Sequence, residues 1–214
     1  MQGIFITIEG PDGSGKSTLI KELIPLIEKT CRVPLCVTRE PGGIDISEQI
    51  RQIILSPENS AMDDRTEALL YAAARRQHLV QKVLPALEAG KLVLCDRFVD
   101  SSLAYQGAGR QLGMEEVWQI NQFAIQGTMP NLTLYLDVDA AVGLERINKG
   151  RKTSELDRLD QEALAFHETV REAYLVLLDN HPERIKKIDA SQDIATVTSA
   201  CYNLVREHFP DYFN

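Results

Sequence analysis

The sequence predicts an α/β fold in which helices cover both faces of a parallel sheet. Short runs of continuous apolar residues alternate along the chain with longer segments whose apolar residues recur every three to four positions. Unbroken apolar runs are typical of strands buried on both faces, as in a parallel sheet whose crossover connections are helices. The 214 residues show no repeat or obvious linker, so we expect a single domain over residues 1–214.

Five apolar runs predict the strands of this sheet. They cover residues 4–9, 34–38, 92–96, 132–137 and 185–188. The third run, Leu-Val-Leu-Cys-Asp, is apolar up to its last residue, which indicates a strand buried on both faces.

The segments between the strands predict helices. They cover residues 16–29, 46–55, 64–79, 115–125, 140–147, 162–178 and 194–208. In the first helix, Leu19, Ile20 and Leu23 recur on one face. The third opens with Asp64-Arg65-Thr66-Glu67, which resembles a capping box, and Pro85 is expected to bend or interrupt it before Gly90.

Composition and charge exclude several classes of protein. Hydrophobic residues make up 44% of the chain and charged residues 25%, which excludes wholesale disorder. The net charge of −8 argues against a general affinity for nucleic acid, because such binding depends on Lys and Arg displacing counterions from phosphates. A local cluster of arginines can still bind a small anion.

The chain also lacks the features of a membrane or exported protein. No apolar run approaches the roughly 20 residues of a membrane-spanning helix, and the first residues form no basic leader. The four cysteines show no CxxC pair or zinc spacing, and Cys95 lies within an apolar run. We therefore expect a cytoplasmic protein without a membrane partner or a zinc site.

A complete phosphate-binding loop follows the first predicted strand. The sequence Gly10-Pro11-Asp12-Gly13-Ser14-Gly15-Lys16-Ser17 matches GxxxxGK[ST] and lies between a strand and a helix, as that motif requires. Backbone N–H groups of such a loop surround phosphate oxygens, and the helix N-terminus favours the negative charge. We expect these residues and Thr18 to bind ATP, with Lys16 reaching the β- and γ-phosphates. The fold class is thus a P-loop NTPase type.

A magnesium site is expected between this loop and a carboxylate at the end of a neighbouring strand. Ser17 supplies a hydroxyl ligand, and the carboxylate is Asp96 or Asp137. We favour Asp96 because Arg97 follows it, which places a cation beside the metal for an anionic acceptor. Asp137 is then structural or caps a helix.

A guanine-specific GTPase is disfavoured. The nearest match to its NKxD motif is Asn-Lys-Gly-Arg at residues 148–151, which lacks the aspartate and follows a helical pattern instead of a strand.

Three further stretches resemble bacterial thymidylate kinases. They are Thr-Arg-Glu-Pro-Gly-Gly (38–43), Glu-Ala-Leu-Leu-Tyr-Ala-Ala-Ala-Arg-Arg (67–76) and Asp-Arg-Phe-Val-Asp-Ser-Ser-Leu-Ala-Tyr-Gln-Gly (96–107). The similarity extends from the first strand to the last helix. It implies a homodimer that converts dTMP and ATP into dTDP and ADP with Mg²⁺.

The resemblance also implies roles for the dTMP-binding residues. The expected set is Asp12, Glu40, Arg51, Tyr71, Arg75, Arg97, Ser102 and Gln106. Arg97 and Arg51 would bind the acceptor phosphate, Asp12 and Glu40 would line the same space, and Tyr71 would stack on thymine. Arg75 would hydrogen-bond a base carbonyl, with Ser102 and Gln106 near the base. Spacing alone places Tyr71 and Arg75 on one helix face, which is equally typical of a core tyrosine and a solvated arginine.

One position departs from part of the family. Some members carry an arginine inside the P-loop where this chain has Gly13, so the cation that stabilises the transferred phosphoryl must come from elsewhere. Arg151, Lys152 and Arg158 resemble a basic lid, about residues 148–160, that closes over ATP and is expected to be mobile. A solvated surface loop is the alternative. The resemblance further places Arg146 and residues 190–192 near adenine.

The expected catalytic residues are therefore Lys16, Arg97, Arg151, Lys152 and Arg158. Two other functions remain open from the sequence. One is a kinase for another pyrimidine nucleotide or for a deoxynucleoside, and the other is a P-loop switch that hydrolyses ATP while regulating a partner.

Overall fold

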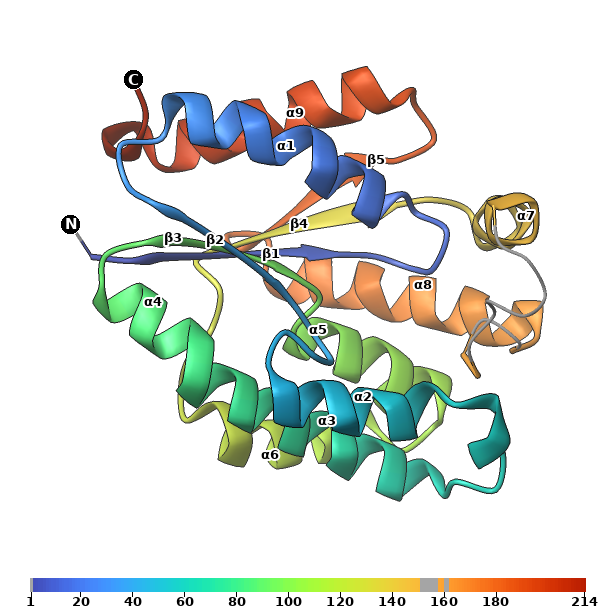
Figure 1. The fold of residues 1–214 in the computed structure, drawn as a ribbon. Helices are drawn as coiled ribbons and strands as arrows, with labels where there is room; N and C mark the ends of the chain where they lie inside the picture. Colours follow the sequence, from blue (N-terminus) through green and yellow to red (C-terminus); the bar gives the residue numbers. More distant parts are fainter. Residues whose placement is uncertain (1, 151–157, 160–161) are drawn as a thin grey trace.

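The computed structural model describes residues 2–150, 158–159 and 162–214. Within these ranges, parallel strands form one sheet in the order β2-β3-β1-β4-β5 (Figure 1). The strands are β1 (Ile4–Glu9), β2 (Leu35–Arg39), β3 (Leu92–Asp96), β4 (Leu132–Asp137) and β5 (Ile185–Asp189). The prediction of a five-stranded parallel sheet with helices on both faces is confirmed.

The strand register places the polar strand ends at one edge of the sheet. Ile8 of β1 is level with Asp96 of β3, and Asp96 is level with Arg39 of β2. On the other side, Glu9 of β1 is level with Tyr135 of β4. Ligands of parallel α/β proteins bind at this carboxyl edge, so the fold brings the predicted site residues to one place.

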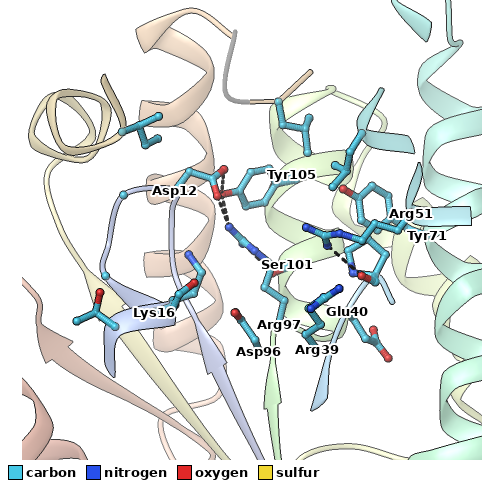
Figure 2. Close-up of a pocket in the computed structure, with 18 of the residues that line it drawn as sticks. Asp12, Lys16, Arg39, Glu40, Arg51, Tyr71, Asp96, Arg97, Ser101 and Tyr105 are labelled. Atoms are coloured by element: carbon cyan, nitrogen blue, oxygen red, sulfur yellow. Dashed lines mark hydrogen bonds and ion pairs between the residues drawn. The ribbon is translucent and has the colours of Figure 1, made fainter. Parts of the chain in front are cut away.

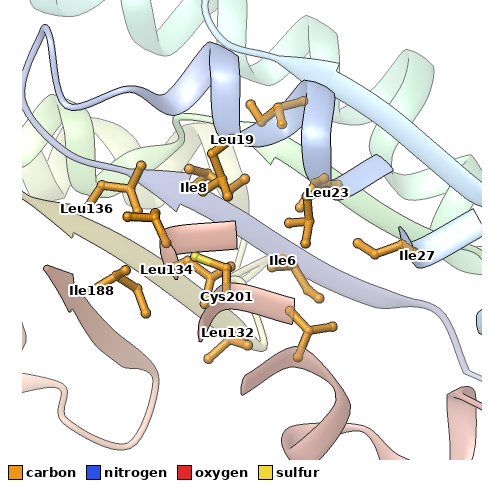
Figure 3. Packing of buried hydrophobic residues seen from close by; sticks show 14 of the residues in the cluster. Ile6, Ile8, Leu19, Leu23, Ile27, Leu132, Leu134, Leu136, Ile188 and Cys201 are labelled. Carbon is orange, nitrogen blue, oxygen red and sulfur yellow. The ribbon is translucent and has the colours of Figure 1, made fainter. Parts of the chain in front are cut away.

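One face of the sheet is covered by α1 (Lys16–Thr30) and α9 (Ile194–His208), which lie side by side above it in Figure 1. Ile6 and Ile8 of β1 meet Leu19 and Leu23 of α1 there, and Cys201 of α9 closes the cluster (Figure 3). All five are buried. Burial of this apolar surface is the main force that holds α1, and with it the P-loop, against the sheet.

The remaining helices lie mostly on the other face. They are α2 (Asp45–Leu55), α3 (Asp64–His78), α4 (Leu84–Glu88), α5 (Val99–Ser102), α6 (Met114–Ile125) and α8 (Leu164–Asn180), with α7 (Ala140–Gly150) beyond the end of β4 (Figure 1). Short segments η1 (Pro57–Asn59), η2 (Leu79–Val83), η3 (Leu103–Gly109) and η5 (Pro210–Tyr212) complete the chain. No helix in the described ranges has the length and hydropathy needed to span a membrane.

The third predicted helix differs from expectation at both ends. Its N-cap is Asp63, whose side chain accepts hydrogen bonds from the N–H groups of Arg65 and Thr66, so the cap lies one residue earlier than the capping-box pattern suggests. Glu67 therefore does not cap the helix and is fully buried. At the other end, the helical backbone widens into a π-helical turn at η2 and continues past Pro85 to Glu88.

Candidate active site

A cavity of about 920 Å³ opens at the carboxyl edge of the sheet (Figure 2). The P-loop, the ends of β2 and β3, and parts of α2, α3 and η3 line it. Its described lining contains six cationic side chains and three carboxylates: Lys16, Lys21, Arg39, Arg51, Arg97 and Arg146, against Asp12, Glu40 and Asp96. The cavity is thus suited to anions although the whole chain is acidic.

The P-loop adopts its turn because glycines occupy the left-handed positions. Gly13 and Gly15 have φ angles of 75° and 91°, a region that costs other residues about 1–2 kcal/mol. A Cβ atom at Gly13 would also overlap the backbone carbonyl of Gly143. Any side chain here, including the arginine found in some relatives, would require the loop or α7 to move.

Lys16 lies beneath this loop at the first turn of α1. Its Nζ donates hydrogen bonds to the carbonyl oxygens of Gly10 (2.9 Å) and Pro11 (2.8 Å). Burial and the neighbouring charge of Arg97 lower the pKa of Lys16 to about 8. An anion bound in the loop favours the charged form of this lysine, so phosphate and proton bind cooperatively.

Arg97 connects the P-loop to the acceptor side of the cavity. Its backbone φ is 66°, which is unusual for a residue other than glycine. The guanidinium donates to Asp12 Oδ1 (2.5 Å) and to Tyr105 OH (3.1 Å), and the Tyr105 hydroxyl donates to Asp12 Oδ2 (2.7 Å) (Figure 2). Burial alone would raise the pKa of Asp12, but the charges of Arg97 and Lys16 outweigh it and hold that pKa at about 2.

Behind Arg97 lies a buried carboxyl group that the sequence did not single out. Glu9, at the end of β1, accepts hydrogen bonds from Phe98 N–H (2.6 Å), Ser101 Oγ (2.5 Å) and Tyr174 OH (2.8 Å). Burial, together with the negative charge of Asp100, raises the pKa of Glu9 to about 7. A substantial fraction of Glu9 is therefore protonated near neutral pH, and neutral Glu9 leaves the positive charge of Arg97 directed at the cavity.

The residues expected to hold Mg²⁺ fit that ion. Asp96 and Ser17 both line the cavity, and Asp96 Oδ1 is buried without a hydrogen-bond partner in the described structure. Asp137 instead pairs with Arg171 (2.8 Å) and Lys187 (3.0 Å), which neutralises it. The described residues contain no cluster of three or more His, Cys, Asp or Glu that could hold a metal alone. This pattern suits Mg²⁺ held by one or two protein oxygens together with water and phosphate.

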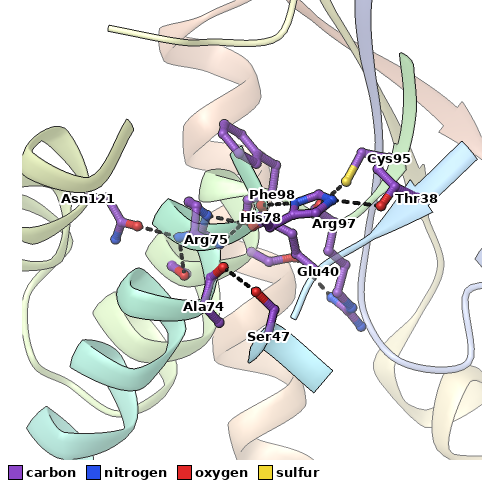
Figure 4. A network of polar contacts seen from close by, with 12 residues as sticks. Thr38, Glu40, Ser47, Ala74, Arg75, His78, Cys95, Arg97, Phe98 and Asn121 are labelled. Atoms are coloured by element: carbon purple, nitrogen blue, oxygen red, sulfur yellow. Dashed lines mark hydrogen bonds and ion pairs between the residues drawn. The ribbon is translucent and has the colours of Figure 1, made fainter. Parts of the chain in front are cut away.

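On the acceptor side, Glu40 is the centre of a buried polar network (Figure 4). Its two oxygens accept from Arg75 Nε (2.7 Å) and contact His78 Nδ1 (2.8 Å), while His78 Nε2 contacts Thr38 Oγ1 (2.6 Å). Buried polar groups need such partners, and here they fix the carboxylate at the cavity wall.

Arg75 and Ser102 lie behind this wall. Arg75 is 1% exposed and donates to Glu40, to Ser102 Oγ (3.0 Å), to Phe98 O (2.9 Å) and to Asn121. Neither Arg75 nor Ser102 is among the described residues that line the cavity. The structure thus places Arg75 as a support for Glu40, whereas Asp12, Arg51, Tyr71, Arg97 and Gln106 line the cavity directly.

The outer wall contains residues from α2 and α3. Arg51 Nη1 donates to the carbonyl oxygen of Pro41 (2.9 Å), and Tyr71 lines the cavity nearby, as Figure 2 shows. Arg39, which sequence reasoning missed, also lines it and pairs with Glu48 (2.8 Å). Its position inside the Thr-Arg-Glu-Pro-Gly-Gly stretch was a usable signal.

The expected lid residues are only partly described. Arg151 and Lys152 lie outside the described residues. Arg158 is described, but its guanidinium contacts the carboxylate of Glu67 and the carbonyl of Ile54, and it is not among the described residues that line the cavity. Its neighbour Leu159 does line the cavity.

A second, smaller cavity adjoins the P-loop on the side of α9. Ser14, Gly15 and Thr18 line it together with Arg146, whose Nη1 donates to Ala190 O (3.0 Å). Gln192 also contributes. Of the residues expected near adenine, Arg146, Ala190 and Gln192 are brought together, whereas Ser191 is not among the described residues that line this cavity.

Known proteins are similar to this chain over nearly its whole length. A family model described as thymidylate kinase matches residues 8–201. A thymidylate kinase of Enterococcus faecalis is 58% identical and one of Lacticaseibacillus casei 56%, each over 100% of both chains. A crystal structure of thymidylate kinase from Ehrlichia chaffeensis superposes with a TM-score of 0.78 at 28% identity, covering 96% of this chain and 100% of that one. The chain belongs to the thymidylate kinase family.

Proposed function

We propose that the protein transfers the γ-phosphoryl group of Mg-ATP to the phosphate of dTMP, forming dTDP and ADP for dTTP synthesis. One observation supports the proposal: the P-loop lysine, the carboxylate of Asp96 and a set of arginines line one cavity, to which Tyr71 and Tyr105 also contribute. The family membership supports the same reaction.

The donor is held by the P-loop. Backbone N–H groups of the P-loop and of the first turn of α1 bind its phosphates, and Lys16 neutralises charge on the β- and γ-phosphates. Arg146 and the residues of the smaller cavity receive adenine. Ser17 and Asp96 would hold Mg²⁺, which would offset the negative charge of the ATP phosphates.

The acceptor phosphate is bound by Arg97 and Arg51. Guanidinium groups suit phosphate because their paired N–H groups match two oxygens. Tyr71 offers an aromatic face to the base and Gln106 an amide. Asp12 keeps Arg97 oriented, and Glu40, held by Arg75 and His78, lines the same space. The base-facing roles of Arg75 and Ser102 require a rearrangement of their present hydrogen bonds.

The phosphoryl transfer needs no protein side chain to act as a general base. An oxygen of the acceptor phosphate attacks the γ-phosphorus, and the bond to the bridging oxygen breaks, leaving ADP. A phosphate monoester has its second pKa near 6 and so is mostly deprotonated at neutral pH. This agrees with the low pKa of Asp12, which makes that carboxylate a poor proton acceptor. Lys16 and Arg97 contribute positioning and charge stabilisation.

We further propose that the protein works as a homodimer in the cytoplasm. Three neighbouring helices expose large apolar side chains: Ile46 and Ile53 on α2, Leu69 on α3 and Phe123 on α6. A second copy covering these helices would remove that surface from water. The four cysteines are free, as in a reducing compartment. Sedimentation equilibrium on wild type and Phe123→Asp tests the dimer, since the variant is expected to be monomeric.

The reaction is tested by a coupled ADP-release assay with Mg-ATP and an acceptor panel of dTMP, dUMP, UMP, CMP, AMP, GMP and thymidine. Rapid turnover with dTMP, abolished in Lys16→Ala, is the expected result. Preference for thymidine would favour a nucleoside kinase. Equal ADP release with and without acceptor would contradict the kinase and favour an ATP-hydrolysing switch.

A further inference from the structure

We propose that Glu67 is a positioning residue that holds Arg158 and Leu159 in place as a wall of the acceptor pocket, and thereby sets the affinity for the acceptor nucleotide. The inference rests on the proposed function, because it takes the cavity beside Tyr71 and Gln106 as the acceptor pocket.

Glu67 is a buried carboxylate shared by three donors. It is 0% exposed, accepts hydrogen bonds from Gln106 Nε2 (2.7 Å) and from the guanidinium of Arg158, and forms an ion pair with Arg110 Nη2 (3.3 Å). Buried carboxylates are stable only where they are paired and hydrogen-bonded. The three donors come from η3, its C-terminal flank and the segment after α7, so Glu67 connects parts of the chain that are distant in sequence.

The two arginines depend on Glu67 to different degrees. Arg110 has other carboxylates, Glu162 at 2.6 Å and Asp64 at 3.5 Å. Within the described residues, the carboxylate that pairs with Arg158 is that of Glu67. Loss of the charge at position 67 therefore leaves Arg158, which is 11% exposed, without a paired carboxylate among the described residues.

The position of Arg158 determines that of Leu159, the next residue, which is part of the pocket wall. The N–H of Arg158 donates to Leu55 O (3.2 Å) and its Nε to Ile54 O (3.2 Å), which fixes Arg158 to the last turn of α2. The next residue, Leu159, is 6% exposed and belongs to an apolar cluster in which Leu55 and Tyr71 also pack. Leu159, Leu55 and Tyr71 all line the cavity beside Gln106. Together, Leu159, Leu55 and Tyr71 form an apolar wall of the acceptor pocket.

The effect of removing the charge follows from these contacts. Glu67→Gln keeps the shape and an oxygen that accepts from Gln106, but it cannot neutralise Arg158. The guanidinium of Arg158 then moves toward solvent, and the adjoining Leu159 no longer has a fixed position at the pocket wall. Lys16, Arg97 and Asp96 lie on other elements and keep their contacts, so the change should appear mainly in acceptor binding.

The experiment compares Glu67→Gln, Arg158→Gln and the double variant with the matched control Glu162→Gln, which removes a carboxylate from Arg110 but not from Arg158. Isothermal titration with dTMP gives Kd without turnover, and steady-state kinetics give KM for dTMP and ATP. For Glu67→Gln we expect Kd and KM for dTMP to rise about fivefold or more, while kcat at saturating dTMP and KM for ATP change far less. Glu162→Gln should match wild type.

The double variant separates positioning from stability. If the two residues act as one unit, the double variant binds dTMP no more weakly than Glu67→Gln alone. A lower melting temperature with wild-type Kd for dTMP in both single variants would overturn the positioning role. A fall in kcat together with similar rises in the KM values for dTMP and ATP would also overturn the positioning role. If wild type itself does not bind dTMP, the proposed function is contradicted, and the role of Glu67, which depends on it, is contradicted as well. The less buried Arg158→Gln carries the test if Glu67→Gln does not fold.

Discussion

Glu9 makes the stability of the protein depend on pH, and Glu9→Gln isolates that dependence. Burial and the charge of Asp100 raise the pKa of Glu9 from 4.5 to about 7. The folded protein therefore holds this proton more tightly than the unfolded chain does. The stabilisation is fully present below pH 4.5 and is lost as the pH rises through about 7. A shift of this size corresponds to about 3 kcal/mol of unfolding free energy, from about 1.4 kcal/mol per pH unit.

The assay is urea unfolding of wild type and Glu9→Gln between pH 4.5 and 8. Glutamine has the shape of the neutral acid, and its oxygen can still accept from Phe98 N–H. The rotatable hydroxyls of Ser101 and Tyr174 can meet its NH₂ group. Wild type should lose stability relative to the variant as the pH rises, by an amount approaching about 3 kcal/mol near pH 8. The exposed Glu22→Gln controls for the loss of one acidic side chain.

A stability difference that does not change between pH 4.5 and 8 would refute this reasoning. A slope of the opposite sign would mean that Arg97 keeps Glu9 ionised. In either case the argument that a neutral Glu9 leaves the charge of Arg97 directed at the cavity would fail.

Three further predictions test individual parts of the site. In urea unfolding, Gly13→Ala should lower the unfolding free energy by more than about 2 kcal/mol, because its methyl group would overlap Gly143 and its backbone is left-handed. Gly15→Ala has the same kind of backbone but open space around its Cβ atom, so it should lower the unfolding free energy by only about 1 kcal/mol. Arg97→Lys should lower kcat/KM for dTMP about a hundredfold, since lysine cannot serve two oxygens at once; an unchanged value would contradict its phosphate contact. Asp96→Asn should raise the Mg²⁺ concentration for half-maximal activity about tenfold or more. Unaltered Mg²⁺ dependence would remove Asp96 as the metal residue.

The parts of the fold that depend on nearby residues were predictable from the sequence. The strands are continuous apolar runs, and the P-loop needs only a strand, spaced glycines and a following helix. Both are local patterns, and the structure confirms the sheet they predict. The carboxyl ends of parallel strands meet at one edge of the sheet, so Glu40 and Asp96 could be placed near the P-loop from the sequence alone, and the structure has them in the same cavity.

What the sequence did not predict depends on partners far away along the chain. Nothing near Glu67 indicates that Gln106 and Arg158 will surround it, so it resembled a helix-capping residue. One signal was present: Glu67, Tyr71 and Arg75 recur every four residues, which places all three on one inward helix face. The burial of Arg75 depends similarly on Asn121 and Glu40, residues 46 and 35 positions away.

The central claim is that donor and acceptor phosphates meet in one cavity for direct transfer. It is tested most directly by following ATP labelled at the γ-phosphate in the presence of dTMP and Mg²⁺. Direct transfer predicts that the label appears in dTDP at the rate of ADP formation, with little release as inorganic phosphate. Label that appears as inorganic phosphate at the rate of ADP formation, with none in dTDP, would contradict it.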